Sequence, residues 1–243
     1  MKRNMLLLLL LWPLSFISGQ EVFFGLQSGI GWYKMEELKY FNSGINKSSS
    51  IESRLIDDYP PYIYFQPYVS LNWERMEVGI CYSFHSTGSR YSLQDYSGEY
   101  LFDTRISSEG PAILFNFRVF QLSSFRFLVY NEIGLQKTKM VLDESLYLGS
   151  DEVFDESYKF TSTDFYWEPG VKVGYPVASL LFEVNVGYVL QSDGDGLEFQ
   201  GARNKGFLQV AGENVHAGWN GLRLGLTIAI NLTRMKNGGS TDE

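Results

Sequence analysis

The segment Gly221–Leu232 alternates between large apolar residues and small or polar residues. Successive side chains of a β-strand point to opposite faces, so a strand here would carry six large apolar side chains on one face. A helix would spread the same residues around its whole circumference, which makes a strand the better interpretation. The apolar face consists of Leu222, Leu224, Leu226, Ile228, Ile230 and Leu232.

Seven further segments show the same alternation, and each has about the ten residues that a tilted strand needs to cross a bilayer. They span 22–33, 62–73, 76–85, 112–120, 125–136, 165–175 and 180–191. Three short connections alternate with four long polar stretches, which span 34–61, 86–110, 137–164 and 192–218. The pattern predicts an all-β fold: an eight-stranded antiparallel up-and-down transmembrane β-barrel with its long loops at one end.

The apolar face of these strands must point outward. It carries about forty large side chains, whereas the interior of an eight-stranded barrel is only just wide enough for side chains to fill. The opposite face contains many of the chain's 24 glycines, which suit a crowded lumen. Because only lipid tolerates so large an apolar exterior, we expect the strands to be embedded in a membrane.

Aromatic residues lie near both ends of the predicted strands, as they do at the two interfaces of transmembrane barrels. Those expected at the long-loop end are Trp32, Phe84, Phe165, Trp167, Tyr188 and Trp219, and those at the short-turn end are Trp73, Phe125 and Tyr175. Pro67 and Pro169 interrupt two strands, and proline cannot donate a hydrogen bond to a neighbouring strand. We expect a bulge or a local break at each proline.

The inward face carries four acidic and four basic side chains, so its formal charge is zero. They are Glu77, Arg118, Arg126, Glu132, Glu168, Lys172, Glu183 and Arg223. Charges confined to a narrow lumen must pair or lose much of their solvation free energy. The sequence therefore predicts a charge-balanced salt-bridge network that plugs the lumen, rather than an open aqueous pore or a proton path.

The start of the chain has two basic residues, an apolar run and then small residues, which is typical of a secretory signal peptide. We expect residues 1–20 to be the signal peptide, residues 21–232 the barrel with four long extracellular loops, and residues 233–243 a periplasmic tail. Cys81 is the only cysteine, so no internal disulfide is expected. No later segment has the ~18 consecutive apolar residues of a membrane-spanning helix.

This architecture resembles the small eight-stranded outer-membrane barrels, the OmpX-like and OmpA transmembrane-domain-like families. Residues 86–90 (STGSR) and 95–100 (DYSGEY) are also similar to a stretch of uncharacterised outer-membrane barrel proteins. Two features depart from the pattern: no peptidoglycan-binding domain follows the barrel, and the chain continues past the last strand instead of ending on an aromatic residue. The resemblance implies a location in the outer membrane of a Gram-negative bacterium.

Most of the formal net charge of −8 falls in the four polar stretches. Acidic loops disfavour nucleic acid and favour cationic ligands or divalent cations. Asp193, Asp195 and Glu198 offer the hard oxygen ligands that calcium prefers, but they lack the full twelve-residue ligand pattern. We expect no cofactor and no metal site, and outer-membrane lipid as the surrounding partner. The predicted function is that of a monomeric structural or loop-mediated binding or adhesion protein.

Two alternatives stay open at this point. His85, Ser86, Thr87 and Glu99 form a set similar to the His, Ser and Glu residues of outer-membrane lipid A deacylases, although that family has serine where this chain has Thr87. Such an enzyme would need His85 and Glu99 within hydrogen-bond distance. A soluble lipocalin-like carrier would instead need its apolar face inside the barrel and its polar face in water.

Overall fold

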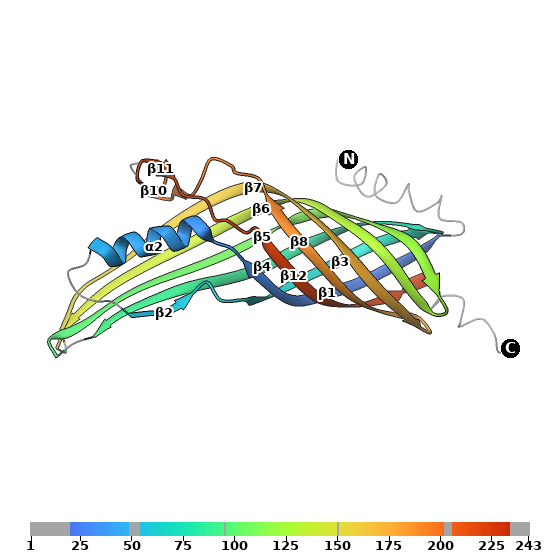
Figure 1. Ribbon diagram of the computed structural model, residues 1–243, viewed down its shortest axis with the longest axis horizontal. Coiled ribbons are helices and arrows are strands. Elements are labelled where there is room, and N and C mark those ends of the chain that lie inside the picture. The colour runs from blue at the N-terminus through green and yellow to red at the C-terminus, as the bar shows by residue number, and fades with distance from the viewer. Residues whose placement is uncertain (1–19, 49–53, 95, 150, 202–205, 234–243) are drawn as a thin grey trace, which may run out of the picture.

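Eight antiparallel strands close into a barrel in the computed structural model, which describes residues 20–48, 54–94, 96–149, 151–201 and 206–233 (Figure 1). Each strand pairs with its neighbours in the chain, and the first pairs with the last. The strands of the ring are β1 (Glu21–Tyr33), β3 (Tyr62–Trp73), β4 (Met76–Gln94), β5 (Gly98–Leu122), β6 (Phe125–Leu148), β7 (Asp151–Val177), β8 (Leu180–Gln191) and β12 (Gly221–Asn231). The predicted eight-stranded up-and-down barrel is therefore confirmed.

Three tight turns join the strands at one end of the barrel. Glu74, Ser123 and Ala178 each turn the chain with a positive φ, of 41°, 55° and 54°. A left-handed residue at the tip of a two-residue loop matches the right-handed twist of the flanking strands. The start of β1 and the end of β12 lie at this same end, since the backbone N–H of Asn231 donates to the carbonyl of Ser179 at 2.7 Å.

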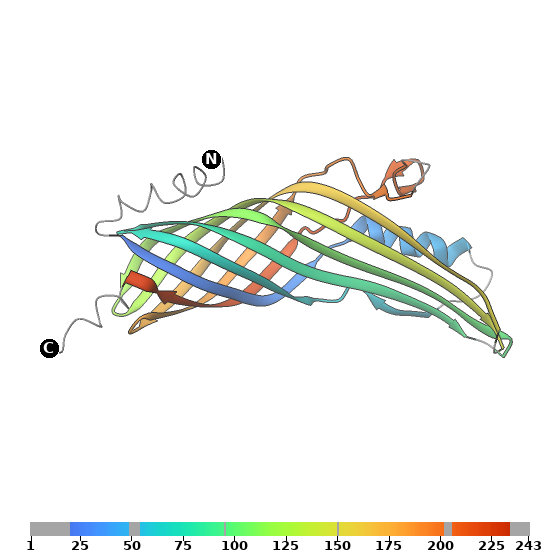
Figure 2. The same ribbon diagram turned by 180° about the vertical axis from the view of Figure 1, so that it is seen from behind.

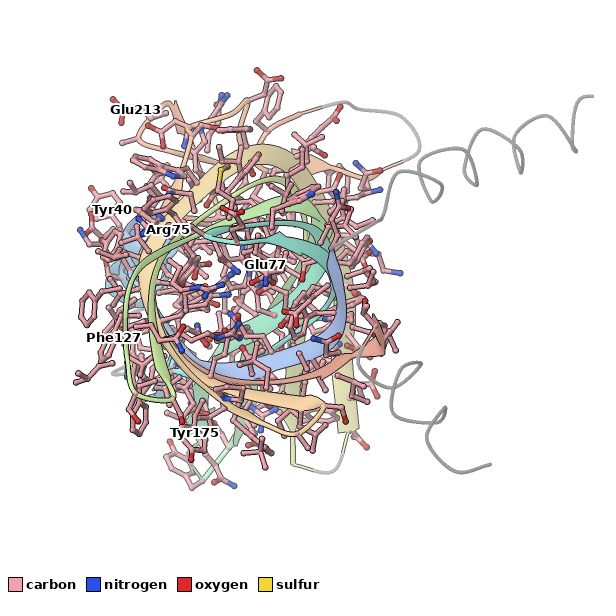
Figure 3. The ribbon with its side chains drawn as sticks, turned by 90° about the vertical axis from the view of Figure 1, so that its right-hand side faces the viewer. Tyr40, Arg75, Glu77, Phe127, Tyr175 and Glu213 are labelled. Carbon is pink, nitrogen blue, oxygen red and sulfur yellow. The ribbon has the colours of Figure 1, made fainter. Side chains whose placement is uncertain are left out.

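The apolar face of the barrel points outward, as the sequence predicts. Leu226 and Ile80 are 65% and 68% exposed, whereas Arg223 and Glu168 are fully buried. Figure 3 looks along the barrel from the short-turn end, with Glu77 inside the ring and Tyr175 outside it. An apolar exterior and a polar interior are the reverse of a soluble carrier, so the lipocalin-like alternative is wrong.

The two prolines interrupt hydrogen bonding without shifting the strands. The β3–β4 ladder has no pairing at Pro67, and the β7–β8 ladder has none at Pro169, but the register is the same on both sides of each gap. The expected local break is confirmed at both prolines, without a bulge. Asn131, a polar residue on the outward face, is satisfied because its Oδ1 accepts a hydrogen bond from the Trp167 indole at 3.0 Å.

The four central strands are much longer than the sequence predicts. Strands β4 to β7 contain 19 to 27 residues, because the polar stretches 86–110 and 137–164 continue the sheet instead of forming loops. Above Pro111, β5 runs on for roughly 40 Å at the rise of a strand. Two of the four expected loops are therefore extended hairpins that leave the barrel at the end opposite the tight turns (Figure 1).

A helix and a short hairpin lie over one side of this extension, and two short strands pair with its outer strands (Figures 1 and 2). They are α2 (Glu36–Ser48), β2 (Arg54–Asp58), β9 (Glu198–Phe199), β10 (Gln209–Val210) and β11 (Glu213–Asn214). Strand β2 pairs with β4, and β9 pairs with β7. The chain is all-β in class, as predicted, but residues 36–48 of the expected polar loop form a helix. Acidic residues in the first turn of α2 favour a helix at this place, because they complement its dipole.

Two predicted segments lie wholly or largely outside the described residues: the signal peptide, and the tail beyond Thr233. Among the described residues, no helix is long and apolar enough to cross a membrane.

Candidate functional site

The centre of the lumen holds a fully buried ion pair. Arg223 on β12 and Glu168 on β7 both point inward, and their Nη1 and Oε2 atoms are 2.8 Å apart. The other carboxylate oxygen of Glu168 accepts a hydrogen bond from the Tyr130 hydroxyl at 2.5 Å, and Arg223 Nε donates to Tyr33 at 3.1 Å. Each charge therefore has both an opposite charge and a neutral hydrogen-bond partner, which a buried ion pair needs in order to be tolerated.

Glu132 lies beside this pair and is held by neutral donors. It is the cross-strand partner of Glu168 and accepts hydrogen bonds from Tyr166 and Gln66. Reasoning from charges alone missed Tyr130 and Tyr166 as partners of these carboxylates, although the inward positions of both tyrosines follow from the strand alternation. Gly187 leaves room for one of them, because a Cβ there would lie 2.0 Å from the hydroxyl of Tyr130.

The remaining predicted lumen residues lie closer to the tight-turn end. Arg126 Nη2 approaches Glu183 Oε1 at 4.0 Å, and Lys172 lies over the ring of Tyr130 with its Nζ 4.6 Å from the centroid. Glu77 accepts a hydrogen bond from Ser70 at 2.5 Å. Arg118 lies apart from the others: at the barrel rim it donates to the backbone carbonyl of Glu74.

Aromatic rings cover the lumen on the side of the long hairpins. Trp219 stands edge-on to both Tyr33 and His85, with ring centroids 4.9 Å and 4.4 Å away, and its indole donates to Thr138 at 3.0 Å. Trp219 is fully buried, so its prediction as a membrane-interface residue is wrong. It follows a turn at Gly218, where φ is +66°, and this turn directs the chain inward before β12 begins.

Above this aromatic cover lies a second, apolar core. The inner face of the extended strands carries Tyr91, Phe102, Ile106, Met140, Leu142 and Phe160, and Met35, Leu38, Leu197, Val215 and Ala217 pack against them. The covering residues come from Met35, from α2 and from the last connection of the barrel. We call the extended parts of β4 to β7, with β2, α2 and residues 192–201 and 206–219, the platform. It is a folded continuation of the barrel with an apolar core of its own.

His216 ties the last connection to α2. Its backbone N–H and its Nδ1 contact Glu37 Oε2 at 2.6 Å and 3.0 Å, and its Nε2 contacts the carbonyl oxygen of Gly194 at 3.0 Å. A carbonyl and a carboxylate only accept, so this geometry suits the imidazolium, which donates from both ring nitrogens. Partial burial lowers the pKa of His216, but the hydrogen bonds to Glu37 and Gly194 outweigh burial and raise the pKa above 6.5.

The residues of the enzyme alternative do not come together. His85 faces the lumen, where Arg223 donates to its Nδ1 and its Nε2 faces the Gln136 amide. Ser108 lies opposite His85 on β5, and Glu99 is nine residues further along that strand, roughly 30 Å away. The arrangement that a lipid A deacylase needs is therefore not formed.

The described part of the chain contains no group of three or more His, Cys, Asp or Glu side chains placed to hold a metal ion. The candidate calcium ligands Asp193, Asp195 and Glu198 thus do not converge.

We predict that Arg223→Met destabilises the barrel by about 3–5 kcal/mol, because Glu168 would keep its charge without a cation in a buried site. Unfolding by urea in lipid vesicles measures this cost. The double variant with Glu168→Gln should recover much of it, because no buried charge then lacks a partner. A double variant as unstable as the single one would contradict this account.

We predict that the tie between α2 and the last connection weakens as pH rises. A pKa raised in the folded protein favours the protonated form, so the stabilisation is complete below 6.5 and is lost as pH passes through the raised value. NMR titration of His216 should give a pKa above 6.5 that falls in the Glu37→Gln variant. An unchanged pKa in this variant would refute the role of Glu37.

Three solved structures are similar to this chain over most of its length. The crystal structure of Neisserial surface protein A (NspA) has 9% sequence identity and a TM-score of 0.36, covering 88% of this chain and 100% of that one. Ail, the attachment invasion locus protein of Yersinia pestis, has 11% identity and a TM-score of 0.35, covering 87% and 96%. The translocator domain of the autotransporter NalP from Neisseria meningitidis has 10% identity and a TM-score of 0.29, covering 95% of each chain.

No protein-family model matches the chain, and no curated protein matches it. The assignment of the fold therefore rests on the structure itself, which has a closed ring of eight strands, an apolar exterior and a filled polar interior. Barrels with an even number of antiparallel strands and an outward apolar band are those of bacterial outer membranes. The chain is an eight-stranded β-barrel of the outer-membrane type, with an apolar exterior and a filled polar interior.

Proposed function

We propose that this protein is a sealed, monomeric and non-enzymatic barrel that presents the platform at the cell surface for binding or adhesion. The observation that carries the proposal is the platform itself. Four strands continue beyond the membrane, and α2 and residues 192–201 and 206–219 cover their inner face with a shared apolar core. A chain that needed only to span the membrane could end its strands at Pro111 and Leu135.

A porin role has no support from the lumen. Arg223, Tyr64, Tyr130, Tyr166 and Lys172 are among the largest fully buried side chains of the described structure, and all of them occupy the lumen. An eight-stranded barrel has little interior space beyond what its side chains fill. The aromatic cover of Tyr33, His85 and Trp219 then separates the lumen from the platform.

The far end of the platform is strongly acidic. Its acidic residues are Glu99, Glu144, Asp151, Glu152, Asp155 and Glu156, and we call this group the acidic tip. Glu144 and Glu156 lie directly opposite each other on β6 and β7. A concentration of one sign of charge at the most distant point favours a cationic partner and disfavours nucleic acid. This supports an encounter surface for cationic ligands, or for divalent cations that bridge to anionic ones.

We predict that the purified barrel forms no stable ion-conducting pore in a planar bilayer. Trp219→Ala removes the indole over the lumen but leaves Arg223 and Glu168 in place, so this variant should also stay closed. Discrete conductance steps from the native protein would overturn the sealed-lumen part of the proposal.

We predict that fluorescent polylysine binds the native chain in neutral nanodiscs, and that Asp151→Asn, Glu152→Gln and Asp155→Asn together weaken this binding severalfold. Removing negative charge at the tip weakens attraction, most visibly at low salt. The matched control removes three charges elsewhere, with Asp193→Asn, Asp195→Asn and Glu213→Gln. Equal losses in both variants would show that the tip is no special contact surface.

A further inference from the structure

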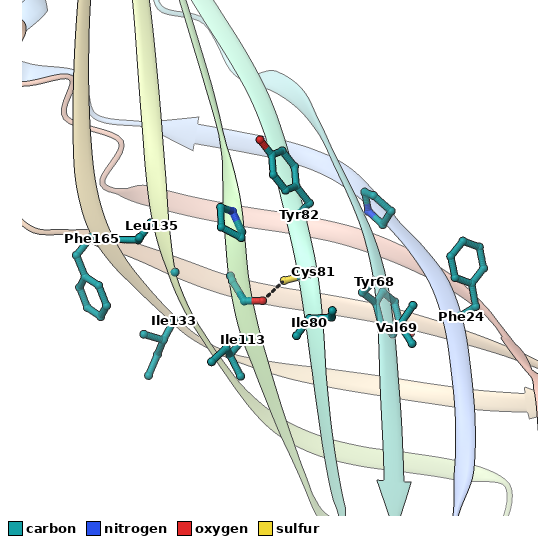
Figure 4. Close-up of a pocket in the computed structure, with 14 residues that line it drawn as sticks. Phe24, Tyr68, Val69, Ile80, Cys81, Tyr82, Ile113, Ile133, Leu135 and Phe165 are labelled. Atoms are coloured by element: carbon teal, nitrogen blue, oxygen red, sulfur yellow. Dashed lines mark hydrogen bonds between the residues drawn. The ribbon is translucent and has the colours of Figure 1, made fainter. Parts of the chain in front are cut away.

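The outer wall of the barrel has an apolar hollow at membrane depth. It has a volume of about 670 Å³ and crosses the wall between Phe24 on β1 and Phe165 on β7 (Figure 4). Ile80 and Ile113 lie along it, and Tyr82 projects at its upper side.

Two prolines explain why the outer surface of the barrel is hollowed at this place. The register of the strands aligns Leu26, Pro67, Tyr82 and Pro111 in a single outward row across four strands, although Pro67 and Tyr82 form no ladder pair. Proline has a compact side chain, and small Ala112 lies inside the wall next to Pro111, so little bulk fills the space around Tyr82. The two prolines therefore create the hollow. They also remove hydrogen bonds between neighbouring strands at the same positions.

The outward face changes from apolar to charged immediately above this row. Leu135 lines the hollow, and the next two outward positions on β6 are Lys137 and Lys139. The rows above run Phe84–Glu109–Lys137–Thr163, then Ser86–Ser107–Lys139–Thr161, then Gly88–Arg105–Val141–Lys159. The first cationic side chain, Lys137, thus lies two residues or about 7 Å along β6 from Leu135. This is the height at which we expect lipid headgroups to meet water.

A second, polar hollow of about 910 Å³ lies on this part of the outer face, where Ser86, Gly88 and Ser107 leave space between the charged side chains. Lys139 and Lys159 line it. Lys139 pairs with Glu109 at 2.5 Å, but Lys137 and Lys159 form no ion pair with any described residue. Lys137 and Lys159 lie on neighbouring strands, offset by four residues or about 13 Å along the strand. Asp57 and Asp103 also line the polar hollow, but basic side chains outnumber them. Unpaired cations on a chain of net charge −8 point to an anionic ligand.

We propose that the two hollows form one binding site for a phosphorylated, multiply acylated glycolipid of the outer leaflet. An acyl chain would occupy the apolar hollow between the prolines, and the phosphate groups would contact Lys137, Lys159 and, by exchange with Glu109, Lys139. Exposed ion pairs contribute little, so this exchange costs little free energy. The proposal rests on the outer-membrane orientation of the barrel and is independent of any binding at the acidic tip.

The test is native mass spectrometry of the full chain in neutral detergent, with purified bis-phosphorylated lipid A and its dephosphorylated form as probes. The native chain should retain the phosphorylated form. Lys137→Gln with Lys159→Gln should weaken its binding by about tenfold, since charge-assisted contacts to phosphate are lost. Pro111→Leu should weaken binding of both forms, because its larger side chain fills the hollow.

Matched variants separate this site from general effects. Lys34→Gln with Lys39→Gln removes the same charge at the start of α2, and Leu226→Phe adds bulk to the lipid-facing side of β12; both should bind like the native chain. Equal binding of the two lipid forms, or equal losses in the paired lysine variants, would overturn the headgroup assignment. Dimers that Pro111→Leu abolishes would show instead that a second copy of the chain covers the hollow.

Discussion

The absence of water from the hydrocarbon core is the constraint on which this structure depends. Every backbone N–H and C=O group at membrane depth must find a partner within the protein, and a closed ring of strands meets this demand. Eleven residue pairs between β1 and β12 complete the ring. Because the ring leaves no free edge, Pro67 and Pro169 cannot be placed on one, and the wall absorbs each as a short gap of unchanged register.

Closure determines what happens on the two faces of the wall. Side chains alternate along each strand, so apolar residues facing lipid require a second set of residues facing a lumen too narrow to hold bulk water. Arg223 and Glu168 are stable there because each meets the other and a tyrosine hydroxyl. Side chains thus replace water as the hydrogen-bond partners of the charges in the lumen. This accounts for a barrel that is filled rather than open.

The same strands reverse this relation where they leave the membrane. Within the barrel Leu135 points outward and Gln136 inward, whereas above it Lys139 points outward and Met140 inward. The solvent outside has changed from lipid to water, so the apolar side chains now belong inside, where α2 and residues 192–201 and 206–219 cover them. The boundary falls between Pro111 and Glu109 on β5. At this boundary the wall has an apolar hollow on the membrane side and unpaired lysines on the water side. An amphiphile with an apolar chain and an anionic headgroup matches both.

Alternation along the chain, by itself, determined the eight membrane strands, their outward face and the identity of the inward charges, because lipid on one side imposes a strong two-residue period. The tertiary structure alone decided the partners of those charges, since pairing depends on register between strands far apart in sequence. It also decided that residues 86–94, 98–110, 137–148 and 151–164 are strand, that residues 36–48 are a helix and that Trp219 turns inward. The outward face of the platform meets water and its inward face is covered by segments distant in sequence, so the periodic signal is weaker there. The apolar side of α2 has a partner only once the curved sheet exists.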